Sequence, residues 1–263
     1  MKMQDKAVLV TGAGRGIGAA MALRFAAEQP RGIVVADIDE VGVRRTAADV
    51  RELGVEVVEM CTDVAEPDQV RELVTAAENA FGPLDLVCSN AGVATGQGIH
   101  APAQVWSRTW AINVLAHVYL AQAVLPRMVR RHEGYLLITA SAAGLLGLPG
   151  DAPYSVTKHA AVGVAEWLAG AYQAAGVRVS ALCPLGVRTD LLMAGVRTGH
   201  VAARVVTSTA PLLEPGDVAE AAVAGLEEER FLILPHPEVA EMSMRRAADP
   251  DAWITEQQRR VNR

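Results

Sequence analysis

Short, almost continuously apolar runs alternate with longer segments of helical periodicity along this chain. Such runs indicate strands that are covered on both faces, as in a parallel sheet. Alternation of strands and helices predicts right-handed crossovers and an α/β fold, a doubly wound parallel sheet of about seven strands with helices on both faces. We expect strands at 7–10, 32–36, 55–61, 84–89, 135–139, 177–183 and 231–234, and helices near 16–29, 40–53, 67–81, 103–131, 153–175 and 215–228.

Composition indicates a globular chain, because 51% of the 263 residues are hydrophobic and 21% are charged. No linker or shift in composition divides it, so we expect a single domain over residues 1–263. A loop region at about 185–214 follows the carboxyl end of a strand, where open α/β sheets bind ligands, and we expect it to contact substrate. A C-terminal tail at about 235–263 carries mixed charges, which suggest a solvated or subunit-contacting segment.

The bulk properties also argue against several classes of protein. A net charge of −6 disfavours nucleic-acid binding, and no uninterrupted apolar stretch is long enough to span a membrane. The N-terminus does not read as a signal peptide, so we expect a cytoplasmic protein. Cys61, Cys88 and Cys183 end apolar runs without ligand-like spacing and are expected to be buried packing residues; the scattered histidines predict no metal site.

A glycine-rich turn joins the first expected strand to the first helix, with the sequence Thr-Gly-Ala-Gly-Arg-Gly-Ile-Gly over residues 11–18. Glycine suits a turn where a pyrophosphate approaches the backbone, and the following helix N-terminus offers free N–H groups to the phosphates. This pattern predicts a Rossmann fold in which the dinucleotide contacts Gly12, Arg15, Gly16, Ile17 and Gly18.

Asp37, at the end of the second strand, bears on the choice of dinucleotide. Its carboxylate can accept both hydroxyl protons of an adenosine ribose and would repel a 2′-phosphate. These properties favour NAD over NADP. Arg15 keeps NADP open, because a guanidinium in the turn can pair with that phosphate.

Tyr154 and Lys158 lie four residues apart in an expected helix, so their side chains share one face. Asp151 suits the N-cap of that helix and Pro153 its first turn. An ammonium group beside the phenol stabilises the phenolate. Tyr154 can then take a proton from an alcohol, or return one to a ketone, as hydride moves to or from a nicotinamide. Ser141, after the fifth strand, would hold the substrate oxygen.

Together these features resemble the short-chain dehydrogenase/reductase family in its compact form, over about residues 5–234. The resemblance implies an oxidoreductase that transfers hydride between NAD(H) and a secondary alcohol or ketone, with Ser141, Tyr154 and Lys158 as the reacting groups. It implies that Lys158 also binds the nicotinamide ribose and that Asn113 holds a water linking this lysine to solvent. The further cofactor contacts that it implies are Asp63 and Val64, Asn90, Ala91 and Gly92, and Pro184 and Thr189.

Two residues depart from that family's pattern. Ser89 stands in place of a common asparagine and would replace only some of its hydrogen bonds. Leu185 stands where glycine commonly follows the proline, which alters the backbone beside the nicotinamide. His117 has no evident partner, and His159 faces away from Lys158 on their helix, so we assign neither a catalytic role.

The side chains expected to contact substrate are mostly apolar and favour an aliphatic, alicyclic or steroid-like compound over a phosphorylated sugar. They are Val93, Ala94, Ala142, Leu145, Leu148, Leu185, Leu191, Leu192 and Met193. Arg188 and Arg197 are near enough to this region that a substrate with an anionic group stays open as an alternative. Small residues over 160–165 permit close helix packing, and the resemblance implies a homo-oligomer, either a dimer or a tetramer, formed by this helix and the 103–131 helix.

Two other functions stay open on such a fold. A nucleotide sensor or regulator would bind the cofactor but has no need of Ser141, Tyr154 and Lys158. A methyltransferase would use a different nucleotide-derived cofactor, and its chemistry also gives Tyr154 and Lys158 no role. Larger sugar epimerases and dehydratases are disfavoured by the short chain and by the three-residue gap between Gly12 and Gly16.

Overall fold

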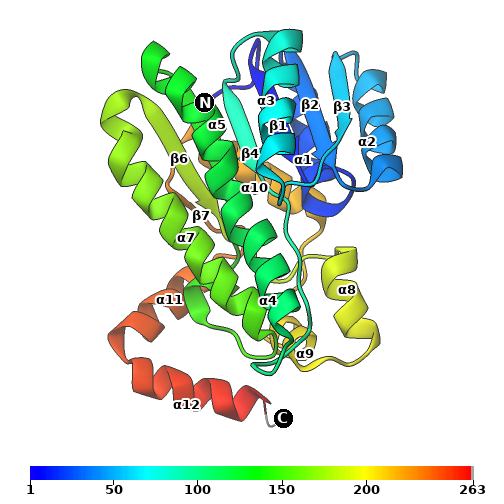
Figure 1. The fold of residues 1–263 in the computed structure, drawn as a ribbon. Coiled ribbons are helices and arrows are strands. Elements are labelled where there is room, and N and C mark those ends of the chain that lie inside the picture. The colour runs from blue at the N-terminus through cyan, green and yellow to red at the C-terminus, as the bar shows by residue number, and fades with distance from the viewer. Residues whose placement is uncertain (262–263) are drawn as a thin grey trace.

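The computed structural model describes residues 1–261; Asn262 and Arg263, which end the predicted tail, lie outside the described part. Seven strands form one sheet in the order β3-β2-β1-β4-β5-β6-β7, and all neighbours pair in parallel (Figure 1). The doubly wound sheet is confirmed: every strand runs in the same direction, and the order in which the chain adds strands to the sheet reverses between β1 and β4. The strands are β1 Ala7–Thr11, β2 Gly32–Asp37, β3 Val57–Cys61, β4 Leu86–Ser89, β5 Gly134–Thr139, β6 Val177–Leu182 and β7 Leu232–Ile233.

Helices cover both faces of the sheet. One face packs against α1 Gly16–Ala26, α2 Glu40–Glu52 and α10 Pro215–Glu227. The other packs against α3 Pro67–Phe81, α5 Ala116–Arg131 and α7 Ala152–Tyr172. The expected helix at 103–131 is continuous, but it consists of α4 Ala103–Trp110, a π-helical turn η1 Ala111–Leu115, and α5. The sequence did not predict that π turn.

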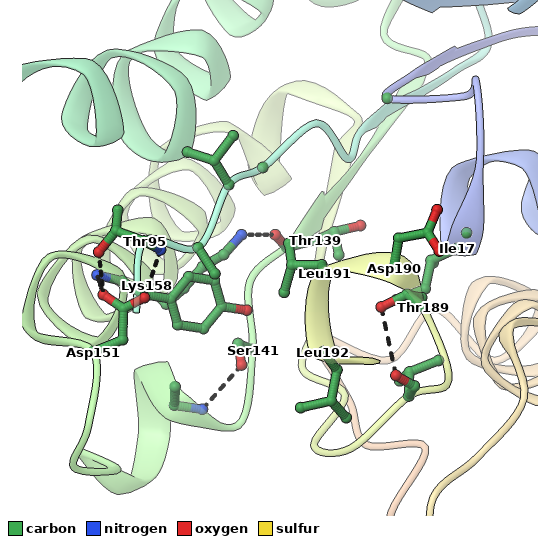
Figure 2. Close-up of a pocket in the computed structure, with 18 of the residues that line it drawn as sticks. Ile17, Thr95, Thr139, Ser141, Asp151, Lys158, Thr189, Asp190, Leu191 and Leu192 are labelled. Atoms are coloured by element: carbon green, nitrogen blue, oxygen red, sulfur yellow. Dashed lines mark hydrogen bonds between the residues drawn. The ribbon is translucent and has the colours of Figure 1, made fainter. Parts of the chain in front are cut away.

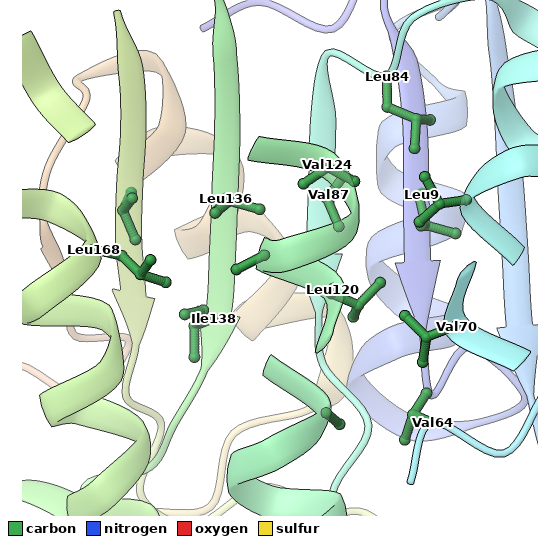
Figure 3. Close-up of a cluster of buried hydrophobic side chains, with 14 of the residues drawn as sticks. Leu9, Val64, Val70, Leu84, Val87, Leu120, Val124, Leu136, Ile138 and Leu168 are labelled. Carbon is green, nitrogen blue, oxygen red and sulfur yellow. The ribbon is translucent and has the colours of Figure 1, made fainter. Parts of the chain in front are cut away.

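Aliphatic side chains fill the core, as the small number of aromatic residues requires. Figure 3 shows Leu9, Val87 and Leu136 projecting from three neighbouring strands toward Leu120 and Val124 of α5. These side chains are almost completely buried. Because the central strands are covered on both faces, they read as continuous apolar runs in the sequence.

Two regions that lacked predicted structure are helical. The loop region contains α8 Asp190–Arg197 and α9 Val201–Thr207, and the expected tail folds into α11 Glu238–Ala248 and α12 Pro250–Val261. Trp253 of α12 is buried and donates its indole N–H to the carbonyl of Leu146 at 2.9 Å. Leu146 is the last residue of the short helix α6 Ala143–Leu146. Figure 1 shows α11 and α12, in orange and red, at the same end of the molecule as α9. The segment therefore packs on its own chain.

Two expectations from the sequence need correction, one about a cysteine and one about the 103–131 helix. Cys61 is exposed, because it ends β3 at the open edge of the sheet, whereas Cys88 and Cys183 are buried as predicted. The helix over 103–131 is long and apolar enough to cross a membrane by length and composition alone, contrary to expectation. Its most apolar window is 56% buried within the protein, which is the packing of a core helix.

Candidate active site

A cavity of about 640 Å³ opens at the carboxyl edge of the sheet, between the ends of β1, β4, β5 and β6 and the helices α8 and α9. Parallel strands place their following loops together at this edge, so segments distant in sequence meet there. All the residues expected to bind the dinucleotide line it, as do Ser141, Tyr154 and Lys158.

The glycine turn forms one wall of the cavity with almost no room for side chains. Gly12 has φ of +65°, in the left-handed region, and a Cβ added at Gly18 would lie 2.1 Å from the Gly12 carbonyl oxygen. Asn90, after β4, donates its amide to the carbonyls of Thr11 and Gly12 at 3.0 and 3.3 Å. The turn is thus braced against the sheet with the N-terminus of α1 facing the cavity, a geometry that suits a pyrophosphate.

At the far end of this wall, Asp37 is held by two backbone N–H groups. Its carboxylate accepts from Gly14 and Asp39, both at 2.9 Å, so its position is fixed beside the turn. The hydroxyl of Thr62 lines the same end, buried and without a partner among the described residues. At this end of the cavity, Arg108 of α4 also donates to the Asp63 carboxylate at 2.7 Å. These polar groups fit the adenosine part of a dinucleotide.

Tyr154 and Lys158 lie one turn apart on α7, with the lysine Nζ 5.8 Å from the centre of the tyrosine ring. Lys158 donates to the carbonyl of Thr139 at 2.8 Å (Figure 2). Burial lowers the pKa of Lys158 to about 8. Burial also raises the pKa of Tyr154, while a hydrogen bond with the Ser141 hydroxyl opposes that rise. The three groups therefore meet in a partly dry site, where charge on one strongly affects the others.

Asp151 does more than cap α7. Its carboxylate accepts from the Tyr154 N–H at 3.0 Å, as predicted for the N-cap, and Pro153 lies in the first turn. It also accepts from the N–H and hydroxyl of Thr95 and the N–H of Gly96, at 2.6 to 2.8 Å. The loop after β4 is thereby tied to the start of the Tyr154 helix (Figure 2).

Asn113 does not line the cavity but lies directly behind its wall. Its side-chain amide pairs with both backbone groups of Val93, each at 2.9 Å, and donates to the hydroxyl of Thr157 at 3.0 Å. Thr157 immediately precedes Lys158. Asn113 thus connects the loop after β4 with the helix turn that carries the lysine.

Six of the nine predicted substrate contacts line the cavity: Val93, Ala94, Leu148, Leu185, Leu191 and Leu192. Ala142, Leu145 and Met193 do not. Ala142 is completely buried and Leu145 packs against the same small core, while Met193 lies on α8 outside the cavity face. The lining residues that the sequence did not reveal include a group from the loop after β4, from Pro149 and from α8, α9 and their connection: Thr95, Gly96, Pro149, Ala194, Gly195, Thr198, His200, Ala202, Ala203 and Val206.

The lid formed by α8 and α9 lies over the cavity and is joined to its opposite rim. His200, which caps α9, has its Nε2 2.8 Å from the carbonyl of Gly96. Arg188 instead pairs with Glu214 at 3.0 Å, and neither it nor Arg197 lines the cavity. The substrate end is therefore mostly apolar, without the arginine that a phosphate would require.

His236, a residue not identified from the sequence, holds the backbone at Leu185 and Gly186. The Leu185 N–H donates to its Nδ1 at 3.2 Å, and its Nε2 lies 3.1 Å from the carbonyl of Gly186. Burial lowers the pKa of His236 and so favours the neutral ring that this arrangement needs. No local pattern signals this contact, because the partners lie some fifty residues apart.

Sequence comparison agrees with this geometry. The family model for short chain dehydrogenases matches residues 6–198. The chain belongs to the short-chain dehydrogenase/reductase family. It is therefore an oxidoreductase of that family, as the resemblance implied.

Two named relatives and one solved structure are also similar to this chain. The chain is 37% identical over 196 residues to 1-deoxy-11-beta-hydroxypentalenate dehydrogenase of Streptomyces exfoliatus, covering 73% of this chain and 71% of the relative. It is 30% identical to estradiol 17-beta-dehydrogenase 11 of Rattus norvegicus, covering 97% and 83%. The crystal structure of a short-chain dehydrogenase/reductase from Burkholderia phymatum in complex with NAD superposes with a TM-score of 0.87, at 30% identity and 96% coverage of both chains.

Proposed function

We propose that this protein is an NAD-dependent dehydrogenase or reductase that interconverts an apolar secondary alcohol and its ketone. The observation that carries the proposal is the meeting of Ser141, Tyr154 and Lys158 in the cavity bounded by the glycine turn. A regulator or a methyltransferase on this fold has no use for that set.

NAD is favoured as the cofactor by Asp37, whose carboxylate is fixed where an adenosine ribose would lie. The NAD-bound structure from Burkholderia phymatum, similar over 96% of the chain, supports the same choice. The residues proposed to hold the cofactor are those of the glycine turn, Asp37, Asp63 and Val64, Asn90 to Gly92, Tyr154, Lys158, Pro184 and Thr189. When bound, NAD supplies the hydride acceptor.

The chain's own groups would handle the proton. Ser141 holds the substrate oxygen, and Tyr154 takes the hydroxyl proton while the carbinol hydrogen leaves as hydride and the carbonyl bond forms. Lys158 stabilises the phenolate by its charge and also contacts the nicotinamide ribose. Asn113 steadies this group from behind and holds a water that links Lys158 to solvent. Ketone reduction follows the same path in reverse.

The lid suits a ring-shaped apolar substrate. Most of the lid side chains that line the cavity are leucine, alanine or valine, with Thr198 and His200 between the two helices, and no arginine of α8 or α9 lines it. Two relatives are named for cyclic alcohols, a hydroxypentalenate and estradiol. We therefore propose an alicyclic or steroid-like secondary alcohol or ketone.

We further propose that residues 1–263 act as one catalytic domain in a cytoplasmic homo-oligomer, either a dimer or a tetramer, without nucleic-acid or membrane partners. Large apolar side chains on two adjacent helices support the oligomer. Trp167 and Val156 of α7 are 66% and 48% exposed, and Trp110 of α4 is 40% exposed. Sedimentation that finds only a 27.8 kDa particle would contradict this part.

The test is absorbance of reduced nicotinamide, with NAD or NADP and a panel of aliphatic, alicyclic and steroidal alcohols. Tyr154→Phe should lower kcat about 100-fold or more while NADH binding stays almost unchanged, since the proton acceptor is lost but nearly all the proposed cofactor contacts remain. Tyr172→Phe, at the other end of α7, is the matched control and should behave as wild type. Cofactor binding without turnover of any compound would favour the regulator, and faster turnover with NADP would overturn the choice of NAD.

A further inference from the structure

Ser89 and His117, two residues without an assigned role, meet inside the protein. Ser89 ends β4 and His117 lies on α5, and the serine Oγ is 2.6 Å from the ring Nδ1. The two residues are only 3% and 1% exposed. The sequence expectation that His117 has no partner is therefore wrong. A polar pair this deeply buried persists only where its hydrogen bonds offset the loss of water.

The pair adjoins the π-helical turn η1, which carries Asn113. His117 lies in the first turn of α5, directly after η1 and four residues beyond Asn113. A π turn interrupts the regular ladder of helix hydrogen bonds and is frequently found at functional sites. The ring therefore ties β4, through Ser89, to the helix turn that directly follows the π turn and its Asn113.

Asn113 in turn is connected to the lysine helix. Its side chain donates to Thr157 at 3.0 Å, and Thr157 precedes Lys158 in α7. Lys158 is then held by the Thr139 carbonyl at 2.8 Å. A displacement of the π turn would consequently move the helix turn that sets the lysine ammonium beside Tyr154.

The His117 ring acts without charge. Burial, together with the positive charge of Lys158, lowers its pKa to about 3, so it is neutral at physiological pH. Its Nε2 is buried and has no partner among residues 1–261. The hydrogen bond to Ser89 is therefore the contact through which the ring can hold this part of the helix.

We propose that His117, together with Ser89, is a positioning residue for the reaction: through its Nδ1 edge it fixes the Asn113 turn and thereby places Lys158. This inference rests on the proposed role of Tyr154 and Lys158. It gives the serine at position 89 a purpose, because its hydroxyl is the anchor of the ring.

Two isosteric substitutions separate the two edges of the ring. In His117→Asn the amide reaches the position of Nδ1, whereas in His117→Gln it reaches that of Nε2. With the first alcohol that the wild type oxidises, His117→Asn should keep kcat within about threefold, while His117→Gln and His117→Leu should lower kcat about ten- to a hundredfold. The substrate KM and the NADH dissociation constant should stay within about twofold, because neither residue lines the cavity.

Two results would overturn the proposal. One is glutamine rescuing kcat better than asparagine, which would place the function at Nε2. The other is unchanged kcat in every variant with only a lower Tm, which would make the pair purely structural. If His117→Leu fails to fold, Ser89→Ala removes the anchor alone and should lower kcat in the same direction; full activity of Ser89→Ala would also contradict the proposal.

A readout independent of turnover separates this inference from the proposed function. In protein labelled with ¹⁵N-histidine, the His117 ring should stay neutral from pH 5 to 9, and Ser89→Ala should shift its Nδ1 resonance. A titrating ring, or a resonance insensitive to Ser89→Ala, would refute the pairing even if the enzyme turns over. Absence of turnover in the wild type, with this signature intact, would instead refute the proposed function.

Discussion

The two ends of the cavity are built in different ways. At the cofactor end, backbone meets backbone within a short stretch of chain, as where Gly18 lies against the Gly12 carbonyl. At the substrate end, α12 holds the last residue of α6 and the segment just after α9. Arg260 donates to Thr209 at 2.8 Å and Trp253 to Leu146 at 2.9 Å.

This difference explains which end the sequence reveals. A close backbone approach admits only glycine, so the cofactor end leaves a readable pattern. The substrate end is held mainly by apolar packing, which many combinations of side chains can satisfy. The family match accordingly stops at residue 198, before α9, α11 and α12. Substitutions at the two ends should therefore affect different measurements.

The largest effect is expected at the cofactor end. In Gly18→Ala the new Cβ would lie 2.1 Å from a backbone oxygen, which cannot move without opening the turn. NADH affinity, measured by fluorescence, should fall about 100-fold, because a misplaced binding element loses its contacts together. Gly216→Ala is the control, since a Cβ there meets nothing within 4 Å. Equal NADH affinity in both variants would show that the turn tolerates a side chain.

Trp253→Ala tests the substrate end. Loss of this buried indole from the small core that includes Leu146 and Val205 should cost about 3–5 kcal/mol of unfolding free energy. The substrate KM should rise about tenfold while the NADH dissociation constant is unchanged, since the loosened elements, α6 and α9, border the substrate end and not the glycine turn. Trp253→Phe, which keeps most of the volume, should lose about 1 kcal/mol. A parallel loss of NADH affinity would mean that the two ends are not separable.

Asp37→Ala sharpens the comparison within the cofactor end. Removing the carboxylate takes away both the ribose acceptor and the repulsion of a 2′-phosphate. The ratio of kcat/KM for NAD over NADP should fall about tenfold or more, which corresponds to one close charge interaction. If the wild type already prefers NADP, Arg15 rather than Asp37 decides the choice.

Leu191→Ala and Met193→Ala form a matched pair on α8. Leu191 lines the cavity and Met193 does not. The first should raise the substrate KM about three- to tenfold, as expected for a few lost methylene contacts, and the second should leave it unchanged. Equal effects of the two substitutions would mean that α8 turns a different face to the substrate.

The smallest effect concerns pH. His236 accepts from the Leu185 N–H, and its pKa is lowered, so the folded state prefers the neutral ring. Its contribution to stability is present above the ordinary pKa of about 6.5 and is lost as pH falls below it. In urea unfolding, the difference between wild type and His236→Leu should therefore shrink from pH 7.5 to pH 5.5. If the difference in unfolding free energy is the same at both pH values, protonation of His236 is not coupled to folding.

The sequence by itself determined the doubly wound sheet, the glycine turn, the position of Asp37 and the helix that pairs Tyr154 with Lys158. These features depend on periodicity, on steric exclusion at glycine and on the fixed spacing of one helical turn, all of which are local. The predicted strand boundaries agree within about two residues for the same reason.

Only the tertiary structure decided which of the predicted leucines face the substrate, where α12 packs, and that Ser89 meets His117. Each of these depends on contacts between residues tens of positions apart, and apolar helices of similar pattern can pack in many ways. Ala142, Leu145 and Met193 look the same in sequence as Leu191 and Leu192 because burial direction is set by the neighbouring elements. The helix that carries Tyr154 and Lys158 could be predicted from the chain, whereas the contacts that support it depend on the sheet bringing distant segments together.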